Sequence, residues 1–158
     1  MSVRICFSYS VCKYMLIGQY THQIDTKKRL SLPAKWRSEV GEKLVITSGL
    51  DKSLYLYTTN EWEGVAEKIF SLGFTSDEAR SFTRFMLANA YEVEIDSAGR
   101  ILLPDALKKF ANLNNKVVLI GMHKRIEIWG QDEWEKYSNR AMGEAESVAN
   151  RLGELGVL

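Results

Sequence analysis

One nine-residue phrase occurs twice in this chain, and that repeat restricts the possible folds more than any other feature. The phrase reads DTKKRLSLP at residues 25–33 and DSAGRILLP at residues 96–104. Asp, Arg and Pro stand at the same places in both copies, which are 71 residues apart. Self-similarity at a fixed offset indicates a duplicated structural unit. We therefore expect two copies of one module to make up most of the chain.

The similarity extends past the phrase if one inserted residue is allowed. An offset of 72 places Val45 on Val117 and the Glu-Trp-Glu run around Trp62 on the run around Trp134. This alignment predicts four segments: an N-terminal extension at 1–14, a first module with its helix at 15–74, a connecting helix at 75–88, and a second module with a C-terminal helix at 89–158.

Each module has the pattern of a small β unit. YEVEID at residues 91–96 alternates apolar and charged residues, the period of two expected of a half-buried strand. A short apolar strand follows the Asp-to-Arg loop, and Pro33 or Pro104 then suits the first turn of a helix. Two further strands joined by a hairpin turn come next. A longer amphipathic helix begins near Trp62 or Trp134.

A lone module of this size would have a marginal core and open strand edges. We therefore expect the two copies to close on each other about a pseudo-two-fold axis and to complete one β-barrel. The predicted fold is mainly β with α (α+β), with helices flanking the barrel. In this arrangement the two Asp-to-Arg loops occupy symmetry-related places and point toward a common side.

Two predicted helices lie outside the barrel. The segment 75–90 carries a capping-box pattern, Thr75 with Glu78, and is interpreted as the connector. The C-terminal helix has an apolar seam at steps of three and four residues, formed by Trp134, Tyr137, Ala141, Ala145, Val148, Leu152 and Leu155. This seam could pack on its own domain or on a neighbouring subunit, and packing within the chain is the simpler expectation.

Composition excludes several functional classes. With 46% hydrophobic and 26% charged residues, the 158-residue chain resembles a soluble globular protein, and no apolar run is long enough to span a bilayer. Cys6 and Cys12 have no second cluster with which to form a zinc site or a disulfide framework, and a reducing cytoplasm suits them. The first fourteen residues lack the features of a signal peptide. No phosphate-loop, metal or nucleophile motif is present, so we expect no enzyme, catalytic residue, metal, cofactor or small-molecule substrate.

The formal net charge is only +1, so any attraction to nucleic acid must come from local clusters of charge. The segment 22–37 provides one, with a single acid, Asp25, and an excess of four positive charges. Its basic residues are Lys27, Lys28, Arg29, Lys35 and Arg37.

The repeated arginines are the strongest candidates for contact with DNA. Paired loops would present Arg29 and Arg100 together, and a guanidinium can bind guanine or phosphate with two hydrogen bonds. Asp25 and Asp96 are interpreted as structural residues of the loops, because a carboxylate facing DNA would repel phosphate. Lys27 and the neighbouring Lys28 fit a phosphate contact and a merely solvated turn equally well.

The segments MLIGQYTHQIDTKKRLSLPAKWR and DSAGRILLPDALKKFANLNNKVVLIGMHKRIEIW resemble the two halves of the MraZ family of bacterial transcriptional regulators. The resemblance implies two tandem AbrB-like swapped-hairpin modules, assembly of subunits into a homo-oligomeric ring, and a cytoplasmic, nucleoid-associated protein. It also implies sequence-specific binding to double-stranded DNA at repeated promoter boxes of the division and cell-wall gene cluster, with repression as the outcome. The loop residues Lys27, Lys28, Arg29 and Arg100 would then face the DNA.

The chain departs from the family pattern in two places. Lys28 stands where the family has Gly, as at Gly99 in the second loop, so a positive φ there would strain the lysine backbone. Family members begin at the position of Met15, so we expect residues 1–14 to be dispensable for folding. Two other functions remain open: a protein-interaction module of the antitoxin type, and a nucleoid protein without sequence preference.

Overall fold

A computed structural model describes residues 15–157, and in that range the two modules have the same order of elements. The expected dispensable extension at 1–14 lies outside the described residues. The first module contains β1 (Leu16–Gln23), β2 (Arg29–Ser31), α1 (Ala34–Val40), β3 (Lys43–Ser48), β4 (Leu54–Thr58) and α2 (Thr59–Phe70). The second contains β5 (Tyr91–Glu94), β6 (Arg100–Leu102), α4 (Asp105–Phe110), β7 (Lys116–His123), β8 (Ile126–Gly130) and α5 (Gln131–Glu154). Helix α3 (Asp77–Leu87) lies between them.

The modules exchange strands. In the six-stranded antiparallel sheet, with order β1-β7-β8-β4-β3-β5, the first strand of each module pairs with the third strand of the other. At the centre, β4 pairs with β8 so that Tyr55 lies opposite Glu127. The short strands β2 and β6 form a separate ribbon, again with one strand from each module. Neither module therefore completes its own sheet.

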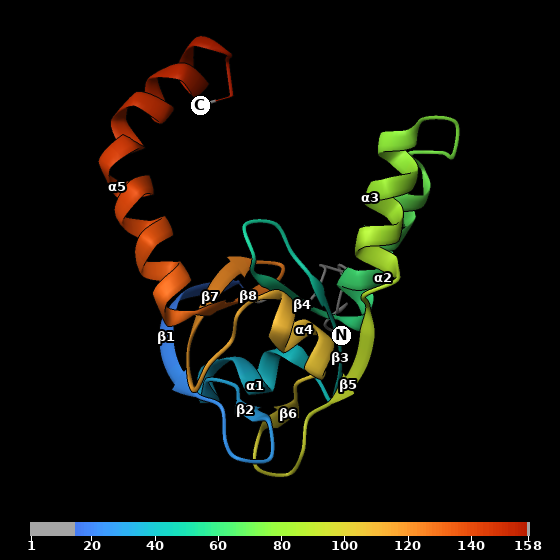
Figure 1. Ribbon diagram of the computed structural model, residues 1–158, viewed down its shortest axis with the longest axis vertical. Helices are drawn as coiled ribbons and strands as arrows, with labels where there is room; N and C mark the ends of the chain where they lie inside the picture. The colour runs from blue at the N-terminus through green and yellow to red at the C-terminus, as the bar shows by residue number, and fades with distance from the viewer. Residues whose placement is uncertain (1–14, 158) are drawn as a thin grey trace, which may run out of the picture.

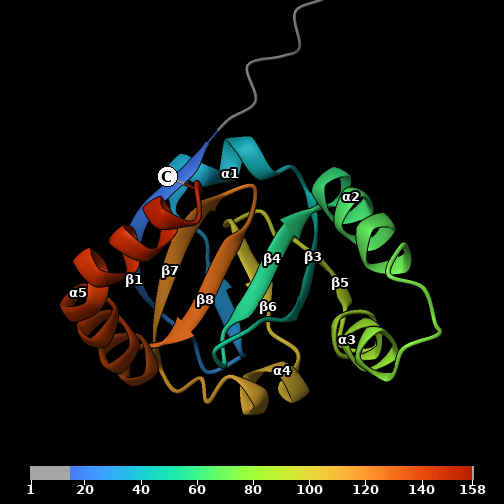
Figure 2. The ribbon, with the colours of Figure 1, turned by 90° about the horizontal axis from the view of Figure 1, so that it is seen from above.

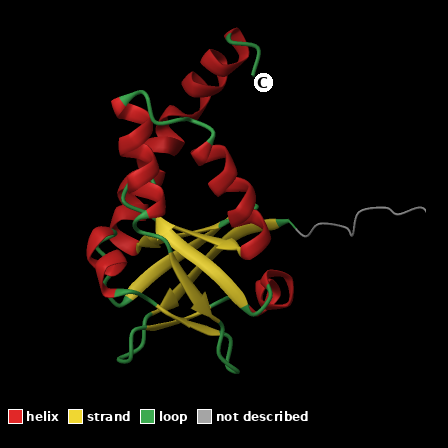
Figure 3. Cartoon of the chain, turned by 90° about the vertical axis from the view of Figure 1, so that its right-hand side faces the viewer, coloured by secondary structure: helices red, strands yellow, loops and turns green. Residues whose placement is uncertain are grey.

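The predicted α+β fold of two tandem modules is confirmed, but the hydrogen-bonded sheet does not close into a ring. Strands β1 and β5 end the large sheet, and the β2–β6 ribbon covers its open side (Figures 1 and 3). The isolated bridge between Ile24 and Leu30 joins the end of β1 to the ribbon. The result is a barrel-like cage around one core.

Apolar residues from both modules fill this cage. Because side chains alternate along a strand, every second residue of the strands points inward. The core has matched members from the two copies: Leu30 and Ile101, Leu32 and Leu103, Leu54 and Ile126, Leu56 and Ile128. Each of these side chains is at most 1% exposed. Trp36 of α1 also enters the core and packs its ring edge-on against Tyr20, with centroids 4.8 Å apart.

Strand pairing corrects the expected alignment of β3 with β7. His22 in β1 is the first-module counterpart of Val93 in β5. Val93 pairs with Leu44 and His22 pairs with Val117, so Val117 is the counterpart of Leu44 and not of Val45. Compared with the first module, the second module has two more residues between Pro104 and β7, and one fewer in the β7–β8 hairpin. Adjacent apolar residues in a buried strand hide such a shift, because several registers look equally hydrophobic.

Three helix starts also differ from expectation. Pro33 and Pro104 are the N-caps, with ψ near 133° and 135°, so each helix begins one residue later than predicted. In α3 the cap is Ser76, whose hydroxyl accepts a hydrogen bond from the N–H of Ala79, and the predicted capping box at Thr75 is wrong.

The long helices rise from the end of the cage opposite the ribbon. Figures 1 and 2 place α5 beside β7 and β1, and the α2–α3 pair beside β3 and β5. Trp62 and Trp134 anchor α2 and α5 as predicted: Trp62 contacts Tyr57 and Trp134 contacts Trp129, with ring centroids 5.7 and 5.3 Å apart. No helix within residues 15–157 has the length and apolarity needed to cross a bilayer.

Beyond its first turns, α5 does not pack against the other elements of residues 15–157. Residues 139–151 are all exposed, and no residue of α5 is buried. The expectation that the whole seam packs on its own domain is therefore wrong. The 24-residue helix is about 36 Å long, and its C-terminal part extends away from the sheet (Figure 1).

Candidate nucleic-acid interface

The loop between β1 and β2 is organised around the carboxylate of Asp25. Its Oδ1 accepts hydrogen bonds from the backbone N–H groups of Lys27 and Arg29, both at 2.9 Å. Its Oδ2 accepts a hydrogen bond from Arg29 Nε at 2.8 Å. The carboxylate thereby fixes both the turn and the direction of the arginine side chain.

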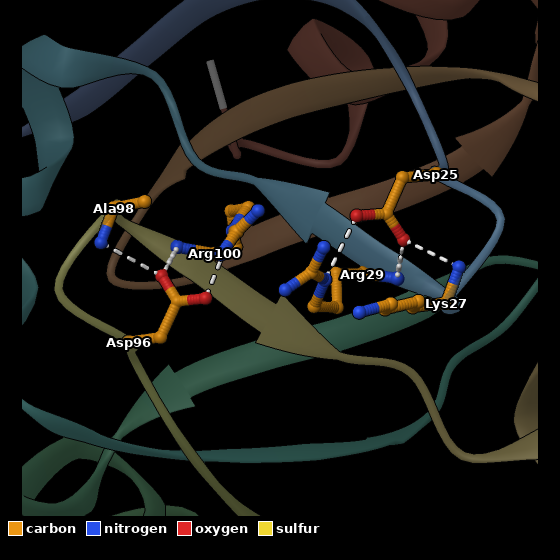
Figure 4. A network of polar contacts seen from close by, with 6 residues as sticks. All are labelled: Asp25, Lys27, Arg29, Asp96, Ala98 and Arg100. Atoms are coloured by element: carbon orange, nitrogen blue, oxygen red, sulfur yellow. Dashed lines mark hydrogen bonds and ion pairs between the residues drawn. The ribbon is translucent and has the colours of Figure 1, made fainter.

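The loop between β5 and β6 repeats these contacts. Asp96 Oδ1 accepts from the N–H groups of Ala98 and Arg100 at 2.9 and 3.0 Å, and its Oδ2 accepts from Arg100 Nε at 2.8 Å. Figure 4 shows the two Asp–Arg pairs on neighbouring strands. Each aspartate thus accepts the same three hydrogen bonds within its own loop.

The ribbon brings the two arginines together on one face. Arg29 lies opposite Leu102, and Arg100 lies opposite Ser31. Residues opposite one another, and residues two apart, share a face of a ribbon, so these four side chains point the same way. The outer position of this face is clear from Leu102, which is 59% exposed. The two loops lie at the same end of the molecule (Figures 1 and 3).

Each Asp–Arg pair leaves part of its guanidinium available. Arg29 and Arg100 are about one-third exposed, at 29% and 31% of their side chains. Within residues 15–157, no hydrogen bond reaches the Nη atoms of either arginine, because the aspartate takes only Nε. Each guanidinium therefore retains four of its five N–H donors for a ligand outside the chain.

Backbone hydrogen bonds keep both aspartates ionised. The N–H of Arg29 lowers the pKa of Asp25 below its ordinary 3.8, and the Arg29 guanidinium and Lys27 N–H add to this effect. The pKa of Asp96 is lowered in the same way, first by the N–H of Arg100. Hence both arginines stay paired with a negative partner at neutral pH.

Lys28 has the backbone geometry anticipated from its alignment with glycine. Its φ is 61° and that of Gly99 is 76°, so both positions are left-handed. The lysine side chain is not free in this structure. Its Nζ donates to Oδ2 of Asp105, the first residue of α4, at 2.7 Å.

Sequence reasoning missed two residues that hold the loops. Asp105 pairs with a lysine 77 residues away, and no local pattern connects them. The sequence identified Arg37 only as one of the basic residues of segment 22–37. In the structure its guanidinium lies against Gly99, and a Cβ added to Gly99 would be 2.3 Å from Arg37 Nε. Arg37 Nε also donates to the carbonyl of Leu32 at 2.7 Å.

Backbone contacts link each loop to the strand of the other module. Leu32 N–H donates to the carbonyl of Gly99, and Leu103 N–H donates to the carbonyl of Lys28, both at 2.9 Å. The two loops are therefore fixed relative to one another. In the described part of the chain, no group of three or more His, Cys, Asp or Glu side chains is placed to hold a metal ion.

Comparison with known proteins finds one family for the whole of this architecture. The family model described as "MraZ protein, putative antitoxin-like" matches residues 15–85 and again residues 86–154. A protein named transcriptional regulator MraZ from Thermoanaerobacter sp. (strain X514) is 46% identical over 143 residues, which is 90% of this chain and the whole of the relative. Proteins with the same name from Caldanaerobacter subterraneus subsp. tengcongensis and Clostridium tetani are 45% and 44% identical over the same extent.

Proposed function

The chain belongs to the MraZ family, and from this premise we propose that it is a transcriptional regulator that binds double-stranded DNA through its paired loops. One observation supports this most strongly: Arg29 and Arg100 share the outer face of the ribbon, each with its Nη groups unused by the described residues. The relatives carry the name of a regulator and not of an enzyme. We accordingly assign no catalytic residue.

In the proposed complex the ribbon face approaches a groove of the duplex. The arginines contact base edges or phosphates with their Nη groups, while the aspartates keep both side chains extended. Lys27 has no side-chain partner within residues 15–157 and is suited to a phosphate. Such pre-organised side chains lose little rotamer freedom on binding, which favours affinity.

Resemblance to the family supports binding at repeated boxes in the promoter of the division and cell-wall gene cluster. Occupation of such a promoter would exclude polymerase and repress transcription. A protein with this role acts in the cytoplasm, at the nucleoid.

We further propose that several subunits act together. The outer half of α5 presents an apolar strip, Ala141, Ala145, Val148 and Leu152, and the first three of these residues are exposed. At the end of the α2–α3 pair, Phe70 and Phe74 are each 80% exposed. Contact between the strip of one copy and the phenylalanines of the next is head-to-tail, and such contacts can close into a ring. Helices α2, α3 and α5 extend from the end of the molecule opposite the ribbon, so the loops of every subunit would remain free (Figure 1).

The decisive experiment compares two duplexes at matched salt: the DNA upstream of the division and cell-wall gene cluster of the same genome, and a shuffled sequence of equal length. Preference for the first supports a sequence-specific regulator. Equal binding would instead indicate a nucleoid protein without sequence preference. Absence of binding to either would indicate a protein-interaction module and would contradict the proposal.

A further inference from the structure

The two loops share the same aspartate and arginine contacts but differ at one ion pair. Lys28 of the first loop binds Asp105 of the second module, with Nζ and Oδ2 2.7 Å apart. The second-module counterpart of Lys28 is Gly99, and the first-module counterpart of Asp105 is Ala34, and neither of these residues carries a charge. The Lys28–Asp105 pair thus exists on only one side of the pseudo-two-fold axis.

The position of this pair matters because it lies at the proposed interface. Lys28 is adjacent to Arg29 and belongs to the turn that leads into the ribbon. Both side chains are accessible, at 49% for Lys28 and 62% for Asp105. A phosphate approaching the first loop would therefore meet a lysine already neutralised by a carboxylate.

Asp105 is well held as an anion. It occupies the first turn of α4, where a negative charge is favourable. The hydrogen bond from Lys28 lowers the pKa of its carboxyl, and the charges of Lys28, Lys108 and Lys109 add to this effect. At neutral pH the carboxylate is thus a constant competitor for the Lys28 ammonium.

We propose that Asp105 restrains DNA affinity by holding Lys28 away from phosphate. This inference rests on the proposed function, since it concerns the same loops. In the intact protein Lys28 then adds no phosphate contact, and the first loop binds any duplex through Lys27 and Arg29 alone. A low affinity for each site makes stable binding depend on several sites held at once. Asp105 would thus favour tandem boxes over scattered DNA.

The test measures binding of the full chain to the upstream and shuffled duplexes over a range of salt concentrations. In Asp105→Asn the lysine is released, so log K should fall more steeply with log salt by about 0.9, the share of one phosphate. Both duplexes should bind about fivefold more tightly at about 0.15 M salt. The matched control is Asp77→Asn, which makes the same charge change on α3, where Asp77 pairs with Arg80. This control should leave the slope unchanged.

A second background isolates Lys28. In Lys28→Gly, which carries the residue of the second loop, adding Asp105→Asn should not steepen the salt dependence. The inference is overturned if Asp105→Asn behaves like Asp77→Asn, or if the steepening persists without Lys28. Binding by the unaltered protein separates the two proposals. If the unaltered protein binds neither duplex, both the proposed function and this inference fail. If it binds and the variants match the control, only the inference fails.

Discussion

Leu30 lies directly opposite Ile101 in the two-stranded ribbon, and both side chains are fully buried. The pseudo-two-fold axis passes between them, so Arg29 and Arg100, each one residue earlier in the chain, are related by that axis. Their common direction follows from strand geometry, because neighbours of an inward-facing residue point outward. The core thereby sets the orientation of the proposed DNA-binding surface.

Removal of both arginines should weaken DNA binding without unfolding the protein. For Arg29→Ala with Arg100→Ala we expect a loss of about 1 to 3 kcal/mol for each good bidentate base contact. The Asp–Arg pairs are partly exposed, so their loss should change the stability of the fold little. Fluorescence anisotropy on the upstream duplex measures the first effect, and urea unfolding the second. Arg80→Ala with Arg84→Ala removes the same two charges from α3 and is the matched control. Binding unchanged in the Arg29 and Arg100 double variant would exclude these arginines from the interface.

The two left-handed loop positions should respond differently to alanine. Gly99→Ala places a Cβ at a φ of 76° and displaces Arg37, so we expect a destabilisation of about 1 to 2 kcal/mol. Lys28→Ala keeps a residue that already has a Cβ at φ 61° and loses only an exposed ion pair, so we expect a smaller destabilisation.

Urea midpoints of the two variants test this difference. Adding Arg37→Ala to Gly99→Ala separates the collision from the backbone strain, because only the collision is relieved. If adding Arg37→Ala to Gly99→Ala recovers no stability, Arg37 does not constrain the second loop.

Acid should destabilise the loops through Asp25 and Asp96. Their pKa values are lower in the folded state than the ordinary 3.8, so the unfolded chain binds more protons near that pH. The stabilisation is fully present above the unfolded pKa and is lost as pH falls through the folded pKa. We expect the stability advantage over Asp25→Asn with Asp96→Asn to be constant from pH 7 to about 5 and to shrink below about pH 4. Urea unfolding across this range provides the measurement, and a pH-independent difference would contradict it.

The apolar strip of α5 should control assembly. Val148→Asp places a charge in the proposed contact between copies, so we expect light scattering after gel filtration to show a smaller species. Asn150→Asp adds the same charge on another side of α5 and should leave the assembly intact. The smaller species should retain binding to one box but lose the gain from tandem boxes. An unchanged mass for Val148→Asp would remove this strip from the subunit contact.

Sequence patterns predicted the duplication, the order of strands and helices along each module, and the two loops, because these depend on local periodicity and on residues close together in the chain. The left-handed position of Lys28 was also anticipated, from its alignment with Gly99. Pairing between Lys28 and Asp105, and packing of Arg37 on Gly99, could not be predicted, because they arise only when strands of different modules meet. The exact register of β3 was missed for a related reason: neighbouring buried residues such as Leu44 and Val45 are equally apolar, and only pairing distinguishes them.

The exchange of strands between modules has an evolutionary consequence. A polypeptide with a single module could complete the same cage only by associating with a second molecule, at a concentration-dependent entropic cost. Joining two copies in one gene makes that association intramolecular and permanent. It also removes the requirement that the two halves have the same sequence. Lys28 and Gly99 can therefore occupy equivalent positions, which would carry identical residues in a homodimer.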